Sequence, residues 1–361
     1  LKLDNQTKGN FDQSDTTNSV GASIDISWEA DIWGKLSASE ASATSDFQAS
    51  KEDYIAARES LIAQAVKAYL LAIEAYQQKQ ISLDAKDSYE KDLEITQAFF
   101  EAGSKTEQDV SISKANLAAA EDNLAQSENG YKESLRSLEL LLGQYPSGEY
   151  AIEDSFPFEP QIISAGVPSD ILENRPDIRS AERQVASAFN ATTMAKAAKL
   201  PSIALTSNIG GSSDDLNNLA DPTNLFWNLA GNLLTPLFDS GALQDNVEIA
   251  DSNQKAAIAA YQSAALNAFN DVETALSNEN TTRKRIKLLE INYNQSELAY
   301  NFENSKYLQG IGNIMDVNQL NRNMILAKSD LVKAERDLLS ARVNLYLALG
   351  IPAFTQELEI D

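Results

Sequence analysis

The chain has 361 residues, with 29 Lys or Arg against 53 Asp or Glu, and a formal net charge of -24 at pH 7. Nucleic acid is therefore a poor partner, because no basic stripe is available for phosphate contacts. The charge suits either a solvated surface or a pore that attracts cations. The absence of cysteine and histidine excludes thiol catalysis, disulfides, Cys-ligated zinc and His-based acid–base chemistry. No run approaches the about 18 consecutive apolar residues typical of a membrane helix.

A strand pair is predicted within residues 1–34. Residues 1–10 fit the end of one strand, and residues 12–18 are predicted to form a polar tip. Residues 19–28 then alternate, with small or polar residues on one face and apolar residues on the other. About ten residues are what a tilted strand needs to cross a bilayer. A half-buried strand in a soluble sheet has the same pattern, so the pattern leaves both interpretations open.

A long α-hairpin is predicted over residues 35–143. The stretch 36–100 contains no Pro and no Gly and is dominated by Ala, Glu, Lys, Gln, Leu and Ser. One continuous helix of that length would extend for about 100 Å. Gly103 ends the run, and Thr106 with Asp109 offers an N-cap for a return helix. Two helices joined by so short a turn form an antiparallel hairpin.

The return helix carries an apolar or aromatic residue at every seventh position, with a small or apolar residue three positions after each. The pattern recurs between Gly310 and Gly350, where the second position is mostly alanine. Small residues let a neighbouring helix approach closely, so we expect a coiled-coil seam along both return helices. The first seam consists of Val110, Ser113, Leu117, Ala120, Leu124, Ser127, Tyr131, Ser134, Leu138 and Leu141. The second consists of Val317, Leu320, Met324, Ala327, Leu331, Ala334, Leu338, Ala341, Leu345 and Ala348.

The two seams are in a fixed register. Positions 103 and 310, 117 and 324, 143 and 350, and also Gly34 and Gly241, are each 207 residues apart. A constant offset over so long a stretch indicates an internal duplication rather than two unrelated amphipathic helices of similar composition. The second repeat has a helix and a strand before the position equivalent to Leu1. We therefore expect roughly 40 further residues, and any export signal, to precede Leu1 in the gene product.

The residue composition and the hydrophobic pattern change after Gly143. Residues 144–168 are rich in proline and lack a heptad pattern, which favours a loop or a short edge structure. A helix is predicted over residues 169–199, with Ser169 as its N-cap and a break at Asn174 or Arg175. Pro176 then fits the first turn of the continuing helix.

The remaining elements repeat the first half. A second β-hairpin is predicted over residues 200–241, with a polar loop at 212–224 between two alternating strands. A second long α-hairpin follows over 242–350, and residues 351–361 form a small capping tail. A β-hairpin plus a long α-hairpin leaves open strand edges and an unpaired seam, so closure by oligomerisation is expected.

Five stretches carry a family resemblance: SWEADIWGKL, VPSDILENRPDIRSAERQ, LTPLFDSGAL, YLQGIGNIMDVNQL and LLSARVNLYLALG. They resemble the outer-membrane factors, the TolC-like exit ducts of tripartite efflux pumps and type I secretion systems. They look most like the branch that serves resistance-nodulation-division pumps. The resemblance implies a mainly α fold with a membrane β-barrel, in which a homotrimer forms a 12-strand barrel on an α-helical barrel. Residues 144–168 and 351–361 would form its equatorial belt. The lipid-modified cysteine of many members in that branch is absent, which agrees with a missing N-terminus.

The resemblance also implies a function. The protein would be a passive conduit in the outer membrane of a Gram-negative bacterium, extending into the periplasm. Its partners would be outer-membrane lipid, a periplasmic membrane-fusion adaptor and an inner-membrane pump, with no cofactor or metal. The alternative is a structural or adhesive trimeric coiled-coil protein without a pore. An enzyme is not expected, because no His, no Cys and no nucleophile motif is present.

The predicted functional residues lie at the hairpin tips around Gly103 and Gly310. Asp316 resembles an aspartate of the family's periplasmic aperture, where threefold symmetry would produce a ring of carboxylates. Asp109 is its repeat partner, and Tyr307 also resembles an aperture residue. Gln319 occupies the position of a second aspartate found in some members. Alternatively, the two aspartates cap helices and Tyr307 packs in the seam.

A second set of predicted residues belongs to the strands. The apolar face of the barrel is expected to contact lipid through Val20, Ile24, Ile26, Trp28, Leu225, Trp227 and Leu229. Trp28, Trp33 and Trp227 are candidates for an interfacial aromatic girdle. Trp33 lies at a strand-to-helix turn, where packing is an alternative role.

Overall fold

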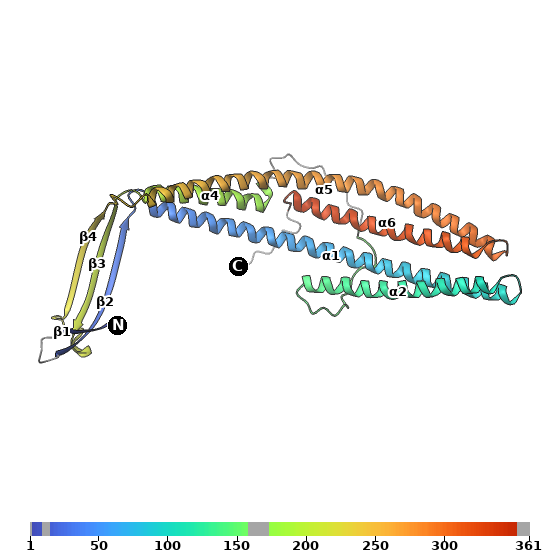
Figure 1. The fold of residues 1–361 in the computed structure, drawn as a ribbon, viewed down its shortest axis with the longest axis horizontal. Helices are drawn as coiled ribbons and strands as arrows, with labels where there is room; N and C mark the ends of the chain where they lie inside the picture. Colours follow the sequence, from blue (N-terminus) through green and yellow to red (C-terminus); the bar gives the residue numbers. More distant parts are fainter. Residues whose placement is uncertain (1, 9–14, 158–172, 352–361) are drawn as a thin grey trace. The chain divides into compact units, whose positions relative to one another are not determined.

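The computed structural model describes residues 2–8, 15–157 and 173–351. These residues fold into two compact units. One consists of Leu1–Ser50 with Ala181–Tyr261, and the other of Lys51–Ser180 with Gln262–Asp361. In chain order (Figure 1), the main elements are β1 (Lys2–Lys8), β2 (Asp15–Ala30), α1 (Lys35–Glu101), α2 (Glu107–Leu141), α4 (Pro176–Ala197), β3 (Ser202–Ser213), β4 (Leu225–Leu234), α5 (Ala242–Leu308) and α6 (Ile314–Ala348).

The internal duplication extends to the helix boundaries. Helices α1 and α5 each have 67 residues, and α2 and α6 each have 35. Their first residues, 35 and 242 or 107 and 314, are 207 apart, the offset seen in the sequence. A carboxylate caps the start of both long helices: Asp31 accepts from the amides of Leu36 and Ser37, and Asp239 from that of Leu243. These bonds satisfy amide groups that have no partner within the helix.

The four strands form one antiparallel sheet in the order β1-β2-β3-β4. The polar tip predicted at 12–18 is wrong in its second half, because β2 already begins at Asp15 and pairs with β1. Positions 12–14 lie outside the described residues. A run of polar residues does not exclude a strand, because the hydrogen bonds of the ladder are made by the backbone.

The pairing register gives the sheet one apolar and one polar face. Ile24 pairs with Ile209, which pairs with Trp227, so the three lie in one row. The next row, on the opposite face, is Asp25, Asn208 and Asn228. Both faces are open in the single chain: on the apolar face Ile24 is 66% and Trp227 77% exposed, and on the polar face Asp25 and Asn228 are exposed. Among the described residues, no helix combines the length and the apolar character needed to cross a membrane.

Two connections, the start of α4 and the junction of β2 with β3, are determined by individual residues. Arg175 interrupts the helical segment, and Pro176 starts α4, as the sequence predicted; Ser169 lies outside the described residues. The Trp33 indole nitrogen donates to the carbonyl of Pro201 at 2.7 Å. This hydrogen bond ties the end of β2 to the start of β3 and supports the packing role of Trp33 over the girdle role.

In the second unit, α1 runs antiparallel to both α2 and α6. Ser82 bonds Ser127 of α2 at 2.8 Å, and Gln78 accepts from Ser329 of α6 at 2.8 Å. All predicted seam residues of α2 and α6 are buried or half-buried, which confirms the heptad analysis. Ala334, in the middle of α6, is completely buried. Small side chains at such positions allow close helix approach along the seam.

A buried ion pair joins α5 to α6. Glu279 accepts two hydrogen bonds from Arg342, at 2.6 and 3.0 Å, and both side chains are buried. Arg283, one turn along α5, donates to the same carboxylate at 3.2 Å. Loss of this carboxylate would therefore leave the buried Arg342 without its charge partner.

We expect Glu279→Gln to destabilise the protein by about 3 kcal/mol, because the amide keeps the shape but not the charge. The measurement is unfolding in detergent followed by circular dichroism. Asp251→Asn is the matched control, since Asp251 forms an exposed pair with Lys255 on the same helix, and it should barely change the midpoint. If the two substitutions lowered the stability equally, the buried Glu279–Arg342 pair would not be a special source of stability.

Candidate functional site

Each α-hairpin turns at a glycine in the left-handed region. Gly103 has φ of 77° and Gly310 has φ of 80°. In both turns the backbone amide of the residue after the glycine donates to a carbonyl in the last turn of the preceding helix. Ser104 donates to the Phe99 carbonyl at 2.9 Å, and Ile311 donates to the Lys306 carbonyl at 3.1 Å. A residue with a Cβ would be strained at these positions. The two tips are therefore compact and closely similar.

The tips contact each other through Lys105. Its ammonium group donates to the carbonyl of Gly312 at 3.0 Å and lies 5.0 Å from the centre of the Tyr307 ring. Residues 105 and 312 are 207 positions apart, so equivalent sites of the two repeats meet here. The ammonium group exchanges part of its hydration for a carbonyl and an aromatic face.

Tyr307 is completely buried in this contact. It packs with Ile314 and Val317 of α6 and meets the ring of Phe99 edge to face, with centroids 5.8 Å apart. This environment supports the seam-packing alternative for Tyr307 rather than an exposed position. Burial raises the pKa of the Tyr307 hydroxyl above its ordinary value, so the group stays protonated at neutral pH.

The Tyr307 hydroxyl lies 2.7 Å from the Thr96 hydroxyl of α1. Thr96 uses its own proton to bond the carbonyl of Asp92, also at 2.7 Å. Because a hydroxyl has a single proton, Tyr307 is the donor in the tyrosine–threonine bond. Ser113 of α2 donates to the same threonine oxygen at 3.2 Å. Thr96 therefore links both α2 and α5 to α1 by hydrogen bonds.

A second polar contact lies two turns further from the tip. Ser88 of α1 is 3.1 Å from the Tyr300 hydroxyl of α5 and accepts from the Asn321 amide of α6 at 3.2 Å. The sequence analysis did not identify Ser88 or Thr96. The available signal was a polar residue at every fourth position, 88, 92 and 96, along one face of an otherwise apolar seam.

The repeat partners Asp109 and Asp316 occupy different environments. Asp109 forms a capping box with Thr106, accepting from its amide and its hydroxyl at 2.8 Å. These bonds hold the pKa of Asp109 below its ordinary value. At the start of α6, Asn313 is the cap. The Asp316 side chain is exposed and has no hydrogen-bond or ion-pair partner among the described residues. Asp109 thus bonds to the cap of its helix, whereas Asp316 lies in the first turn of α6 without such a bond.

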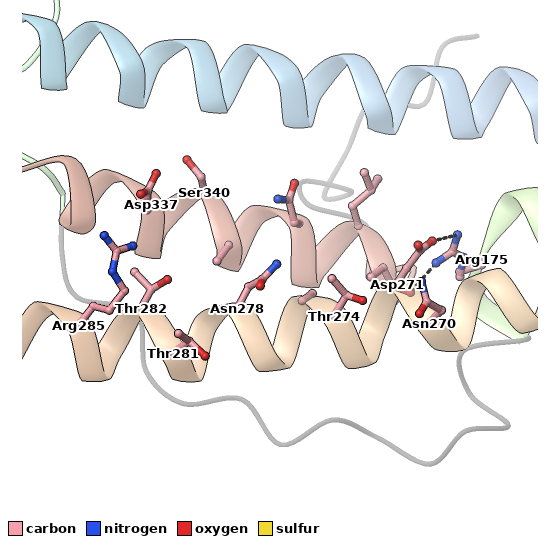
Figure 2. Close-up of a pocket in the computed structure, with 15 residues that line it drawn as sticks. Arg175, Asn270, Asp271, Thr274, Asn278, Thr281, Thr282, Arg285, Asp337 and Ser340 are labelled. Atoms are coloured by element: carbon pink, nitrogen blue, oxygen red, sulfur yellow. Dashed lines mark hydrogen bonds and ion pairs between the residues drawn. The ribbon is translucent and has the colours of Figure 1, made fainter.

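A polar groove of about 620 Å³ lies between α5 and α6, further from the tips. Figure 2 shows Arg175 at one end, beside Asp271, to which it bonds at 3.2 Å. Arg175 also donates to the last carbonyl of α6, at Ala348, at 3.1 Å. Within the described part of the chain, no group of three or more acidic side chains is placed to hold a metal ion.

Comparison with known proteins identifies the class to which this architecture belongs. The chain matches the family of outer membrane efflux proteins over residues 2–144 and 167–351. It is 29% identical over 342 residues to the pyoverdine export outer membrane protein OpmQ of Pseudomonas aeruginosa, covering 93% of this chain and 71% of OpmQ.

Solved structures have the same fold. The Campylobacter jejuni CmeC outer membrane channel superposes with a TM-score of 0.88 at 24% identity, covering 97% of this chain and 76% of CmeC. The Neisseria gonorrhoeae MtrE outer membrane channel, solved in its open state, superposes with a TM-score of 0.84 at 25% identity, covering 97% of this chain and 79% of MtrE.

The chain belongs to the family of outer membrane efflux proteins, which confirms the resemblance noted in the sequence. It serves as an outer-membrane exit channel of a tripartite efflux system in a Gram-negative bacterium and extends into the periplasm. This is a family of channels rather than of enzymes, and its members form trimers that work with an adaptor and an inner-membrane pump.

We expect Tyr307→Phe to weaken the contact between the tips by about 1 kcal/mol, because it removes only the hydroxyl that donates to Thr96. Hydrogen exchange of the backbone amides near Tyr307 and Thr96 should become faster. Tyr145→Phe, which alters a highly exposed tyrosine, is the control and should leave exchange at the tips unchanged. Unaltered exchange in Tyr307→Phe would show that the hydroxyl contributes nothing to closure.

Proposed function

We propose that three copies of the chain close into one continuous channel. Their sheets would form a 12-strand β-barrel in the outer membrane, and their long helices an α-helical tunnel with residues 144–168 and 351–361 around its middle. The observation that carries the proposal is the two-faced sheet, exposed on both faces in the single chain. Strands β1 and β4 each have one unpaired edge, and joining β4 of one copy to β1 of the next removes every open edge.

The two faces of the sheet then have different surroundings. The apolar face, with Val20, Ile24, Ile26, Trp28, Leu225, Trp227 and Leu229, contacts lipid. Trp28 and Trp227 contribute to the interfacial aromatic girdle. The polar row of Asp25, Asn208 and Asn228 faces the water-filled interior. This arrangement is supported by the pairing register, which puts each set on a single face.

The channel closes at its periplasmic end through the tip contact. Engagement by a membrane-fusion adaptor, coupled to a pump of the resistance-nodulation-division type, separates the two α-hairpins by breaking the Tyr307–Thr96 and Lys105–Gly312 bonds. Long seams of this kind allow two discrete packings, since polar contacts between hairpins can be replaced by water on separation. The open state solved for MtrE supports the existence of a second arrangement in this fold.

Asp316 lines the aperture in this proposal. Its exposed carboxylate, repeated in three copies, makes a negative ring that concentrates cations at the entrance. Asp109 has its carboxylate occupied by Thr106 and contributes less to that ring. Gly103 and Gly310 fix the turns from which the aperture is built.

We expect Asp316→Asn to reduce the cation preference of the channel, because it removes one charge per copy from the entrance. The measurement is the reversal potential in a planar bilayer with a salt gradient, using the complete gene product. Asp109→Asn, at the equivalent position of the other repeat, is the matched control and should change selectivity less. An unchanged reversal potential in Asp316→Asn would remove Asp316 from the aperture.

We expect Leu229→Arg to block assembly in the outer membrane, since an arginine on the lipid face costs about 2–4 kcal/mol near the bilayer centre. The adjacent change Asn228→Arg places the same charge on the polar face and should be tolerated. Membrane fractionation and trimer detection by native electrophoresis distinguish the two. If both variants assembled equally, or the protein needed no detergent for extraction, the sheet would not lie in a membrane.

A further inference from the structure

A carboxyl group without a partner lies between the two polar contacts near the tips. Asp92 of α1 is only 4% exposed, and its Oδ2 atom has no hydrogen-bond partner among the described residues. Ser88 and Thr96 lie one turn to either side and hold Tyr300 and Tyr307 of α5. The Asp92 carboxyl is therefore enclosed in the seam that must part when the hairpins separate.

The register between α1 and α6 indicates which residue of α6 lies at the level of this carboxyl. The antiparallel pairs Lys67–Asn344 and Ser88–Asn321 are hydrogen-bonded. One turn further along α1 and one turn back along α6 brings Asp92 opposite Asn318. Asn318 is 2% exposed, and both polar atoms of its side chain lack partners among the described residues. An acid and an amide, each buried and unsatisfied, thus occupy the same level of the seam.

The charged and titratable groups around Asp92 do not neutralise it. Tyr89 on α1, with Tyr300 and Tyr307 on α5, are the titratable groups that sense its charge. On α6, Arg322 acts on Tyr89 and bonds Gln319. On the α2 side of the seam, Asp109 acts on Tyr307 and Lys105 lies over its ring. Burial is the cause that raises the pKa of Asp92 to about 6.

We propose that Asp92 is a proton-operated latch of the tip, which holds the two α-hairpins together when its carboxyl is protonated and favours their separation when it is ionised. A protonated carboxyl can donate to the Asn318 carbonyl oxygen and accept from the Asn318 amide, which satisfies both side chains. An ionised carboxylate can only accept, and it carries a charge into the closed seam. The latch rests on the proposed opening of the tips and adds a regulator to it.

The direction of the pH effect follows from the two states. In the closed seam the pKa of Asp92 is about 6, and in separated hairpins it returns towards the ordinary value of 3.8. The closed contact is thus most stable at pH values below the ordinary pKa. It weakens as the pH rises between the two values and stays weak above about 6. A difference of about two pKa units changes the ratio of closed to open tips by up to about a hundredfold.

The test measures the separation of the tips directly. Because the chain has no cysteine, Glu101→Cys and Gln309→Cys place spin labels on the exposed tips of α1 and α5. The complete gene product is reconstituted with an excess of unlabelled chains, and label distances are measured by electron resonance at pH 4.5 and 7.5. We expect a short distance at pH 4.5 and a longer population, increased at least tenfold relative to the short one, at pH 7.5.

Asp92→Asn should keep the short distance at both pH values, because a neutral amide cannot ionise. Glu94→Gln removes an exposed carboxylate two residues away on the same helix and should behave like the parent. Asn318→Asp provides a second check, since two facing carboxyls share a proton and should move the transition to higher pH.

Distances independent of pH in the parent, or a pH response retained in Asp92→Asn, would overturn the latch. An unmoved transition in Asn318→Asp would overturn the pairing with Asn318. Conductance recorded on the same preparations separates the two proposals. Channels that conduct while their tip distances ignore pH would leave the channel intact and reject the latch alone. Tip distances that respond to pH in a protein without conductance would support the latch and reject the channel.

Discussion

The antiparallel packing of α1 against α6 is the interaction on which the described helical unit depends. A helix of 67 residues cannot be stable by propensity alone and needs lateral contacts along its length. The alanines of α6, such as Ala327, Ala334 and Ala341, are buried and supply little bulk. The helix backbones can therefore approach closely, and polar side chains on both helices come within hydrogen-bond distance. Close approach and polar contacts are two consequences of the same choice of small residues.

The seam is more polar than stability alone requires. Ser88, Asp92 and Thr96 of α1 lie in it near the tips, and within the second hairpin the buried pair Glu279–Arg342 joins α5 to α6. Apolar residues of similar volume would often be at least as stable, but they would resist separation, since exposing them to water is unfavourable. Polar groups fix the register when closed and can bond water when apart. A channel whose hairpins must separate and return benefits from both properties.

The sequence predicted the elements better than their contacts. Glycines and prolines, with the periods of two and seven, placed the hairpins and the seam, because these signals act through local backbone geometry. The start of β2 at Asp15 was missed, since polar residues do not exclude a strand whose ladder is formed by the backbone. The partner of Tyr307 could not be predicted, because periodicity defines which face of α5 is buried but not that Thr96 of α1 meets it. For the same reason, the sequence did not predict that Asp92 and Asn318 lie at the same level of the seam.

Duplication followed by divergence makes the two hairpins of each chain unequal at the tip. Lys105 donates to Gly312, the equivalent position of the other repeat, so equivalent positions of the two repeats contact each other at the tip. The N-cap stands at equivalent positions, Thr106 and Asn313, in the two repeats. Asp109 is bonded to its cap residue Thr106, whereas no such bond joins Asp316 to Asn313 among the described residues. An unoccupied carboxylate is thus present in one repeat only. In the proposed trimer, six hairpin tips would present three such carboxylates, so the charge of the aperture is set by one repeat and its closure by both.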